Sequence, residues 1–306
     1  MNKILTSPSS FGKIGSEPLD ILSKNKYTVI NNPYGRRLTE EEVIDLGFDC
    51  VGIVAGVEPL TKRVMDALPK LKCISRVGIG MDNVDLVYAK QKGIEVVNTP
   101  DGPTRAVAEL TVALTFSLLR KIPEADANMK NGIWKKETGN FLHGKTIGII
   151  GLGRIGKMVS EMFINLGNKV IGYDVDVDSS WAENSKISIQ KNLKELIRGS
   201  DILTVHIPPN RDNSFAIGKD ELNLIKETGF LINASRGGVM DEDFLFDLLS
   251  KNKIRGAAID VFSEEPYYGH LTALKNVILT PHLGSYAAEG KLKMEIDAVN
   301  NLLNNL

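Results

Sequence analysis

The chain has 306 residues, of which 42% are hydrophobic and 25% charged, which is typical of a globular protein with about two domains. Its 37 basic and 38 acidic residues leave a net charge of −1, which argues against a general nucleic-acid or membrane surface. No apolar run approaches the length needed to span a bilayer. We expect no signal peptide, and therefore a cytoplasmic protein in which Cys50 and Cys73 are reduced core thiols.

Short apolar runs alternate with amphipathic helical patterns through the first third of the chain. The helical patterns include 39–47 and 61–71, and the strands are expected at 3–7, 27–32, 50–56, 73–78 and 94–99. Continuously apolar strands that alternate with helices predict a parallel sheet covered on both faces.

The pattern changes at the turn-rich segment NTPDGPT (98–104). A long helix is expected over 104–121, and Pro123 should end or kink it. A second alternating series then begins at 145–156, and its later strands are expected at 169–174, 201–209, 229–235, 254–262 and 277–282. The last segment, 285–306, has the pattern of one amphipathic helix. The sequence therefore predicts two doubly wound parallel α/β domains.

The segment IGIIGLGRIG (147–156) carries the strongest single motif, a G-x-G-x-x-G directly after an apolar strand and before a helix. Gly151 allows a tight turn, Gly153 lets the backbone approach a pyrophosphate, and Gly156 lets the helix pack closely on the strand. Free N–H groups at the helix start and the helix dipole favour binding of the negatively charged pyrophosphate. The motif predicts a dinucleotide-binding loop; a glycine turn in an unrelated fold is the alternative.

The next strand ends at Asp174, 23 residues after Gly151, where an acid can accept hydrogen bonds from the adenosine ribose. A carboxylate there repels the 2′-phosphate of NADP, and residues 175–178 offer no arginine to bind one. We therefore expect NAD as the cofactor.

Hydride transfer needs a proton partner, and the chain has four histidines. His282 follows a strand, as do Arg236 and Glu265, so all three fall on the carboxyl rim of one sheet, where ligands bind in such folds. A guanidinium can bind a carboxylate with two hydrogen bonds, a histidine can move the hydroxyl proton, and a neighbouring carboxylate holds its tautomer. Each residue alone could be a solvated strand-end charge, but their coincidence on one rim favours a catalytic site.

The chain resembles the D-isomer-specific 2-hydroxyacid dehydrogenases, and most closely their D-3-phosphoglycerate dehydrogenase branch. The matching segments cover nearly the whole chain in one order: VGIGMDNVD (77–85), NTPDGPTRAVAELTVAL (98–114), GKTIGIIGLGRIG (144–156), VIGYD (170–174), INASRGG (232–238), AAIDVFSEEP (257–266) and LTPHLGS (279–285). The resemblance implies a Rossmann-type NAD domain over 102–283. It also implies a discontinuous, flavodoxin-like substrate domain made of 1–101 and 284–306, with the active site in the cleft between the two.

The same resemblance implies roles for individual residues. Arg236 would bind the 2-oxo and carboxylate groups of the substrate, His282 would be the acid/base, and Glu265 would be its partner. The backbone at Val77 and Gly78 would cradle the substrate carboxylate. The cofactor contacts would be Arg154 and Ile155 at the pyrophosphate, Asp174 at the ribose and Asp260 near the nicotinamide amide, with weaker expectations for His206, Asn213 and Ala234.

Arg76 falls where phosphoglycerate dehydrogenases place an arginine for the substrate phosphate, and Arg105 is a second candidate anion partner. Alternatively, Arg76 is an ordinary surface arginine and Arg105 forms a salt bridge at the hinge. We expect 3-phosphoglycerate as the substrate, with hydroxypyruvate, glyoxylate or another anionic acid such as sulfolactate as alternatives. A non-catalytic NAD-sensing protein is a remote alternative, and the Glu265 partner disfavours a formate-dehydrogenase-like enzyme.

We expect no metal site, no nucleic-acid partner and no membrane partner. The resemblance also implies a homodimer or higher homo-oligomer, with the long helix after residue 102 at its interface. The chain ends soon after LTPHLGS and one helix, so no serine-sensing regulatory domain is expected.

Overall fold

The computed structural model describes residues 2–210, 212 and 214–306, so the predicted cofactor contact Asn213 lies outside the described residues. The chain divides into two compact units, Met1–Ala106 with Ser285–Leu306, and Val107–Gly284. The domains expected from the sequence have their boundaries at 101/102 and 283/284, within a few residues of these. Both units are parallel α/β layers, which confirms the predicted fold class.

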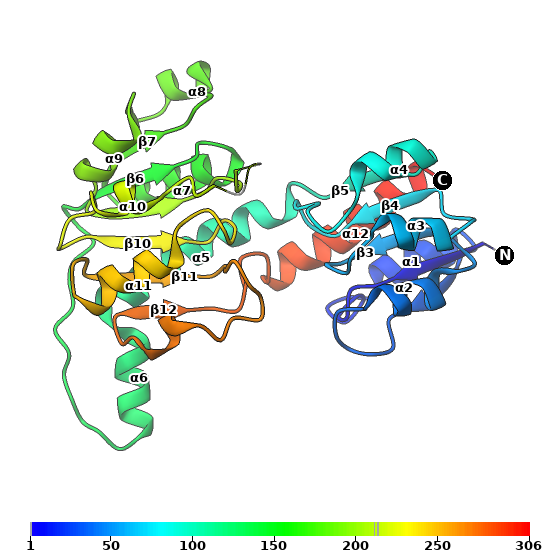
Figure 1. Cartoon of the computed structure of the whole chain (residues 1–306), viewed down its shortest axis with the longest axis horizontal. Helices are drawn as coiled ribbons and strands as arrows, with labels where there is room; N and C mark the ends of the chain where they lie inside the picture. Colours follow the sequence, from blue (N-terminus) through cyan, green and yellow to red (C-terminus); the bar gives the residue numbers. More distant parts are fainter. Residues whose placement is uncertain (1, 211, 213) are drawn as a thin grey trace. The chain divides into compact units, whose positions relative to one another are not determined.

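The first unit contains a five-stranded parallel sheet in the order β2-β1-β3-β4-β5 (Figure 1). The central strand β3 is buried at every position, as a strand covered by helices on both faces must be. The strands lie within the predicted apolar runs and are β1 (Lys3–Thr6), β2 (Thr28–Asn31), β3 (Cys50–Ala55), β4 (Cys73–Arg76) and β5 (Glu95–Asn98).

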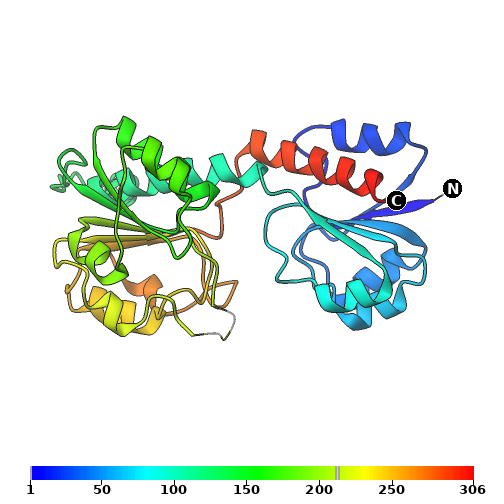
Figure 2. The same ribbon diagram turned by 90° about the horizontal axis from the view of Figure 1, so that it is seen from above.

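Helices cover both faces of this sheet (Figure 2). Leu5, Ile53 and Ile74 belong to a core with helices α2, α3 and α4, whereas their neighbours Ile4 and Val54 belong to a core with α1 and α12. This alternation is the two-residue period of a strand. The helices of the unit are α1 (Glu17–Lys24), α2 (Glu40–Gly47), α3 (Lys62–Ala67), α4 (Leu86–Lys92) and α12 (Ala288–Asn304).

Both cysteines lie in the core of the first unit as free thiols. Burial raises the pKa of Cys50 to about 11 and that of Cys73 to about 12. Both therefore stay protonated and unreactive at neutral pH.

The second unit contains a seven-stranded parallel sheet in the order β12-β11-β10-β9-β6-β7-β8. The chain runs outward from β6 in one direction and then from β9 in the other, so the strand order reverses between β6 and β9. Ligands of such sheets bind beyond the carboxyl ends of the strands at this switch point. The strands are β6 (Thr146–Ile150), β7 (Lys169–Tyr173), β8 (Ser188–Ile189), β9 (Ile202–Val205), β10 (Phe230–Asn233), β11 (Gly256–Ile259) and β12 (Val277–Leu279).

Helix α5 (Gly102–Arg120) begins in the first unit and continues in the second. It ends just before Pro123, as predicted, and α6 (Ile122–Lys130), which was not expected, begins with this proline in its first turn. The other helices are α7 (Arg154–Asn165), α8 (Ser179–Asn184), α9 (Leu193–Gly199), α10 (Lys219–Leu222), α11 (Glu242–Ser250) and the 3₁₀ turn η1 (His270–Ala273). Within the described part of the chain, no helix has both the length and the apolar character needed to cross a membrane.

Candidate active site

The glycine loop joins β6 to α7 at the switch point of the second sheet. Gly151 has φ +92°, and a β-carbon there would lie 2.4 Å from the carbonyl oxygen of His206. A β-carbon on Gly156 would lie 1.9 Å from the carbonyl oxygen of Gly151, whereas one on Gly153 would meet nothing within 4 Å. The first and third glycines are therefore required by close backbone packing, and the second leaves the backbone open.

The first turn of α7 has the features of an anion site. Gly153 is the N-cap residue of this 12-residue helix and offers no side chain to cap it. Arg154 is exposed and Ile155 is half-buried. The N–H groups at a helix start and the helix dipole favour a phosphate, so this turn fits the pyrophosphate of a dinucleotide.

Asp174 follows β7 and holds the glycine loop from its other side. Its Oδ2 accepts the N–H of Leu152 at 2.6 Å, and its Oδ1 accepts the N–H of Asp176 at 3.1 Å. A carboxylate has about four lone-pair sites, so capacity remains for ribose hydroxyls. Asp174 can therefore shape the loop and bind the cofactor at the same time.

His206 follows β9 at the same edge of the sheet. Its Nε2 lies 2.9 Å from the hydroxyl of Thr204, and among the described residues its buried Nδ1 has no hydrogen-bond partner. Burial lowers the pKa of His206 to about 3, so the ring is neutral and cannot serve as an acid at neutral pH. Its position fits a hydrogen-bond contact to a ligand. Ala234, which follows β10, is buried.

Arg236 lies in a turn that Asn233 fixes at the end of β10. Oδ1 of Asn233 accepts both the N–H and the hydroxyl of Ser235, at 3.1 Å and 2.7 Å. A β-carbon on Gly237 would lie 1.9 Å from the carbonyl oxygen of Phe262, so the turn packs directly against the chain leaving β11. Nη1 of the half-buried Arg236 donates to the carbonyl of Ser235 at 2.8 Å. The guanidinium is thus held on the rim of the sheet.

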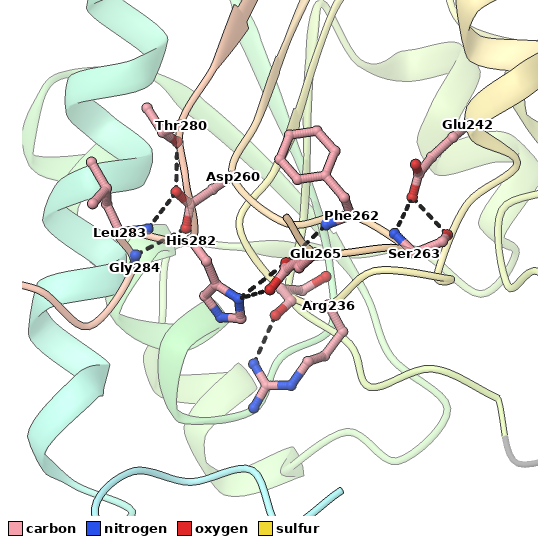
Figure 3. A network of polar contacts seen from close by, with 11 residues as sticks. Arg236, Glu242, Asp260, Phe262, Ser263, Glu265, Thr280, His282, Leu283 and Gly284 are labelled. Atoms are coloured by element: carbon pink, nitrogen blue, oxygen red, sulfur yellow. Dashed lines mark hydrogen bonds and ion pairs between the residues drawn. The ribbon is translucent and has the colours of Figure 1, made fainter. Parts of the chain in front are cut away.

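His282 and Glu265 form a pair on this rim, next to Arg236 (Figure 3). Nδ1 of His282 lies 2.9 Å and 3.1 Å from the two carboxylate oxygens of Glu265, and the N–H of Phe262 donates to Oε1 at 3.1 Å. The side chains of His282 and Glu265 are 45% and 38% exposed, so a substrate can reach them. With Nδ1 committed to the carboxylate, Nε2 is the nitrogen that can exchange a proton with a ligand.

Asp260 holds the turn that carries His282. It is fully buried after β11; Oδ1 accepts the Thr280 hydroxyl at 2.5 Å and the Leu283 N–H at 2.7 Å, and Oδ2 accepts the Gly284 N–H at 2.9 Å (Figure 3). Burial raises the pKa of Asp260, and these hydrogen bonds act in the opposite direction. The resemblance implies a position near the nicotinamide for Asp260, but its hydrogen bonds to residues 280–284 were not expected.

The predicted substrate residues of the first unit lie together at the end of β4. Gly78 has φ +129°, and its N–H donates to the Thr99 hydroxyl at 2.7 Å. The N–H of Val77 donates to the carbonyl of Ala55 at 2.8 Å, and Nη1 of Arg76 donates to the carbonyl of Val77. Arg105 is exposed on α5. The structure therefore groups Arg76, Val77 and Gly78 in one unit, and Arg236, Glu265 and His282 in the other.

The chain is similar to known proteins in sequence. Residues 112–284 match the family model described as D-isomer specific 2-hydroxyacid dehydrogenase, NAD binding domain. The chain is 40% identical over 258 residues to a D-3-phosphoglycerate dehydrogenase of Methanocaldococcus jannaschii, a match that covers 83% of this chain and 49% of that protein. It is 38% identical over 256 residues to a glyoxylate reductase of Thermococcus litoralis, with 80% of this chain and 77% of that protein covered.

A solved structure has the same fold along nearly its whole length. It is a D-lactate dehydrogenase from Aquifex aeolicus complexed with NAD and lactic acid, which matches with a TM-score of 0.83 at 25% identity and covers 99% of this chain and 94% of that one. The chain spans about half the length of the D-3-phosphoglycerate dehydrogenases that it matches, 49% and 54% for two of them.

Proposed function

Because the chain belongs to the family of D-isomer specific 2-hydroxyacid dehydrogenases, we propose that it is an NAD-dependent oxidoreductase acting on a D-2-hydroxy acid and its 2-oxo acid. The observation that carries this proposal is the His282–Glu265 pair beside Arg236, on the same sheet as a loop that fits a dinucleotide. A binding protein without catalysis has no need of a histidine held in one tautomer by a carboxylate.

Different side chains of the second unit have different roles in the proposed reaction. When bound, NADH supplies the hydride for the carbonyl carbon of the 2-oxo acid. Nε2 of protonated His282 gives its proton to the carbonyl oxygen, and the carboxylate of Glu265 at Nδ1 stabilises the charged ring before that transfer. The guanidinium of Arg236 fixes the orientation of the acid and stabilises the negative charge that develops on oxygen.

The cofactor is held by backbone and carboxylate groups of the second unit in this proposal. The open first turn of α7 receives the pyrophosphate and Asp174 receives the adenosine ribose. The carboxylate of Asp174 disfavours a 2′-phosphate, so NAD is preferred to NADP. The backbone at Val77 and Gly78 is proposed to bind the substrate carboxylate.

The substrate itself has two candidate types. Arg76 and the similarity to D-3-phosphoglycerate dehydrogenases favour phosphohydroxypyruvate, as expected from the sequence. The similarity to a glyoxylate reductase favours a short acid without phosphate, such as glyoxylate or hydroxypyruvate.

We further propose a homo-oligomer, supported by Trp134 and Phe141, whose side chains are 79% and 83% exposed. The cytoplasmic location stays a prediction.

The experiment that tests the proposed activity follows NADH oxidation with phosphohydroxypyruvate, hydroxypyruvate, glyoxylate, pyruvate and sulfopyruvate. Turnover of at least one of these acids, lost in His282→Ala, is the expected result. If NADH binds but no acid is reduced by the wild-type protein, the binding-protein alternative replaces this proposal.

A further inference from the structure

A carboxylate is buried at the carboxyl edge of the first sheet, outside every role assigned above. Glu58 follows β3, is 1% exposed, and receives the hydroxyl of Ser7 at Oε1. The N–H of Gly56 donates to its two oxygens at 3.0 Å and 3.1 Å. These groups act as donors toward the carboxylate, so they fit its ionised form.

The charge of Glu58 acts on Arg76. The two residues follow or end neighbouring strands, since Ala55 of β3 pairs with Arg76 of β4. Burial raises the pKa of the Glu58 carboxyl, and the Ser7 hydroxyl and the positive charge of Arg76 both act against that rise. Because Val77 also donates its N–H to the carbonyl of Ala55, Glu58 and Arg76 lie on adjoining strand ends at one edge of the sheet, where opposite charges attract each other.

Arg76 in turn lies against the backbone that is proposed to bind the substrate carboxylate. Its Nη1 donates to the carbonyl of Val77, and a β-carbon built on Gly78 would lie 2.9 Å from that Nη1. Glu58, Arg76 and the backbone of Val77–Gly78 are therefore neighbours at this edge of the sheet. A charge on Glu58 changes the electrostatic potential at the place where a substrate anion would lie.

Glu58 is also fixed in position. The amide of Asn83 donates to the carbonyl of Glu58 at 2.6 Å, and Ser7 ties the same residue to the end of β1. The backbone of Glu58 is therefore tied to the loop of Asn83, and its carboxylate cannot turn away to admit a second anion without breaking its hydrogen bonds to Ser7 and Gly56.

We propose that Glu58 is a specificity-determining residue, which offsets the charge of Arg76 and so selects short 2-oxo acids that carry no phosphate. This inference rests on the proposed function. Phosphate recognition needs an excess of positive charge at the distal end of the substrate. With Glu58 beside it, Arg76 does not supply that excess, and a phosphorylated acid would meet the buried carboxylate as a like charge. Glyoxylate and hydroxypyruvate carry only the one carboxylate, which the backbone at Val77 and Gly78 is proposed to bind.

The experiment compares kcat/KM for hydroxypyruvate and phosphohydroxypyruvate in the wild type, in Glu58→Gln and in the control Glu41→Gln. Glu41 is paired with Arg63 on the surface of the same unit and its side chain is 64% exposed, so the control removes an equal charge elsewhere. We expect the wild type to prefer hydroxypyruvate by about tenfold or more, which is a modest effect for one nearby charge. Glu58→Gln should shift the ratio toward the phosphorylated acid by about tenfold, and Glu41→Gln by less than about twofold.

The outcomes separate this inference from the proposed function. A wild type that prefers phosphohydroxypyruvate overturns the inference and leaves the dehydrogenase proposal standing, and this comparison holds even if Glu58→Gln does not fold. A wild type that prefers hydroxypyruvate, with a folded Glu58→Gln whose ratio does not move, removes Glu58 as the determinant. No turnover of either acid while NADH still binds overturns both proposals together.

Discussion

Replacing Asp260 by asparagine tests how far catalysis depends on the turn that carries His282. The carboxylate of Asp260 accepts three hydrogen bonds, from the hydroxyl of Thr280 and from the N–H groups of Leu283 and Gly284. An asparagine keeps one acceptor oxygen and puts an NH₂ group where the other was. One backbone N–H, most simply that of Gly284, would then face a donor at about the present 2.9 Å.

The size of the effect follows from these contacts. A hydrogen bond to a charged group contributes about 1.5–3 kcal/mol, so one lost bond costs about 2 kcal/mol. His282 has φ +53°, a conformation that an L-residue does not prefer. When the hydrogen bonds from Asp260 are weakened, this strain favours a change in the backbone conformation of the turn, which would displace the His282 side chain. If the whole cost appears in the transition state, kcat falls about thirtyfold.

The assay measures kcat with the best 2-oxo acid, the Kd of NADH, and the melting temperature. Thr280→Val is the matched control, because it removes the hydroxyl bond and keeps the N–H bonds of Leu283 and Gly284; a smaller loss of kcat than in Asp260→Asn is expected, since the bonds that hold the turn itself remain. A positioning role predicts a lower kcat and an NADH Kd near that of the wild type, whereas a nicotinamide contact predicts a weaker Kd. An Asp260→Asn variant with kcat within about twofold of the wild type would falsify the positioning argument.

Four other predictions follow from the second unit. His282→Ala should lower kcat by about a thousandfold and leave the NADH Kd within about twofold; retained turnover would remove His282 from the mechanism. Asp174→Ala should weaken NADH binding by about tenfold and raise the use of NADPH relative to NADH, and an unchanged preference counts against the ribose contact. Gly156→Ala should lower the melting temperature because its β-carbon would lie 1.9 Å from the carbonyl of Gly151, whereas Gly153→Ala should keep the melting temperature and weaken NADH binding; equal melting temperatures contradict this. Folded His206 stays neutral down to about pH 3, but the unfolded chain takes up its proton below about pH 6.5, so this residue costs stability as the pH falls. His206→Gln should therefore recover up to about 2 kcal/mol of unfolding free energy at pH 5 and nothing at pH 8, and a gain of equal size at both values would refute the burial argument.

Much of the fold could be predicted from the sequence because its two parallel sheets depend on local patterns. Continuous apolar runs such as residues 50–56 become strands buried on both faces, and the glycine spacing at 151–156 marks the turn from β6 into α7. Helix α6 was missed because Pro123, a signal for the end of α5, also suits the first turn of a new helix. The two-residue strand β8 is too short to have a periodic pattern.

The common position of the three proposed catalytic residues was predictable for a topological reason. Arg236, Glu265 and His282 each follow a strand, and parallel strands bring their carboxyl ends to one edge. The pairing of Nδ1 rather than Nε2 with Glu265 was not predictable, because it depends on the side-chain geometry after β11 and on the left-handed backbone at His282. The candidate residues could be named from the sequence, whereas only the structure shows that Nδ1 of His282 is the nitrogen paired with Glu265.

Glu58 shows why the substrate is harder to predict than the reaction. In the sequence it is an acid in a loop, between Val57 and Pro59, which is the pattern of a solvated charge. Its burial depends on Ser7 and Asn83, which lie 51 and 25 residues away and reach it only when three loops meet at the edge of the sheet. Arg76 lies 18 residues further along the chain, so the sequence also hides the proposed effect of Glu58 on Arg76, whose charge alone would favour a phosphate. Candidate reactive residues at strand ends can therefore be found from local sequence patterns. The net charge that a substrate meets depends instead on how the loops assemble in the fold.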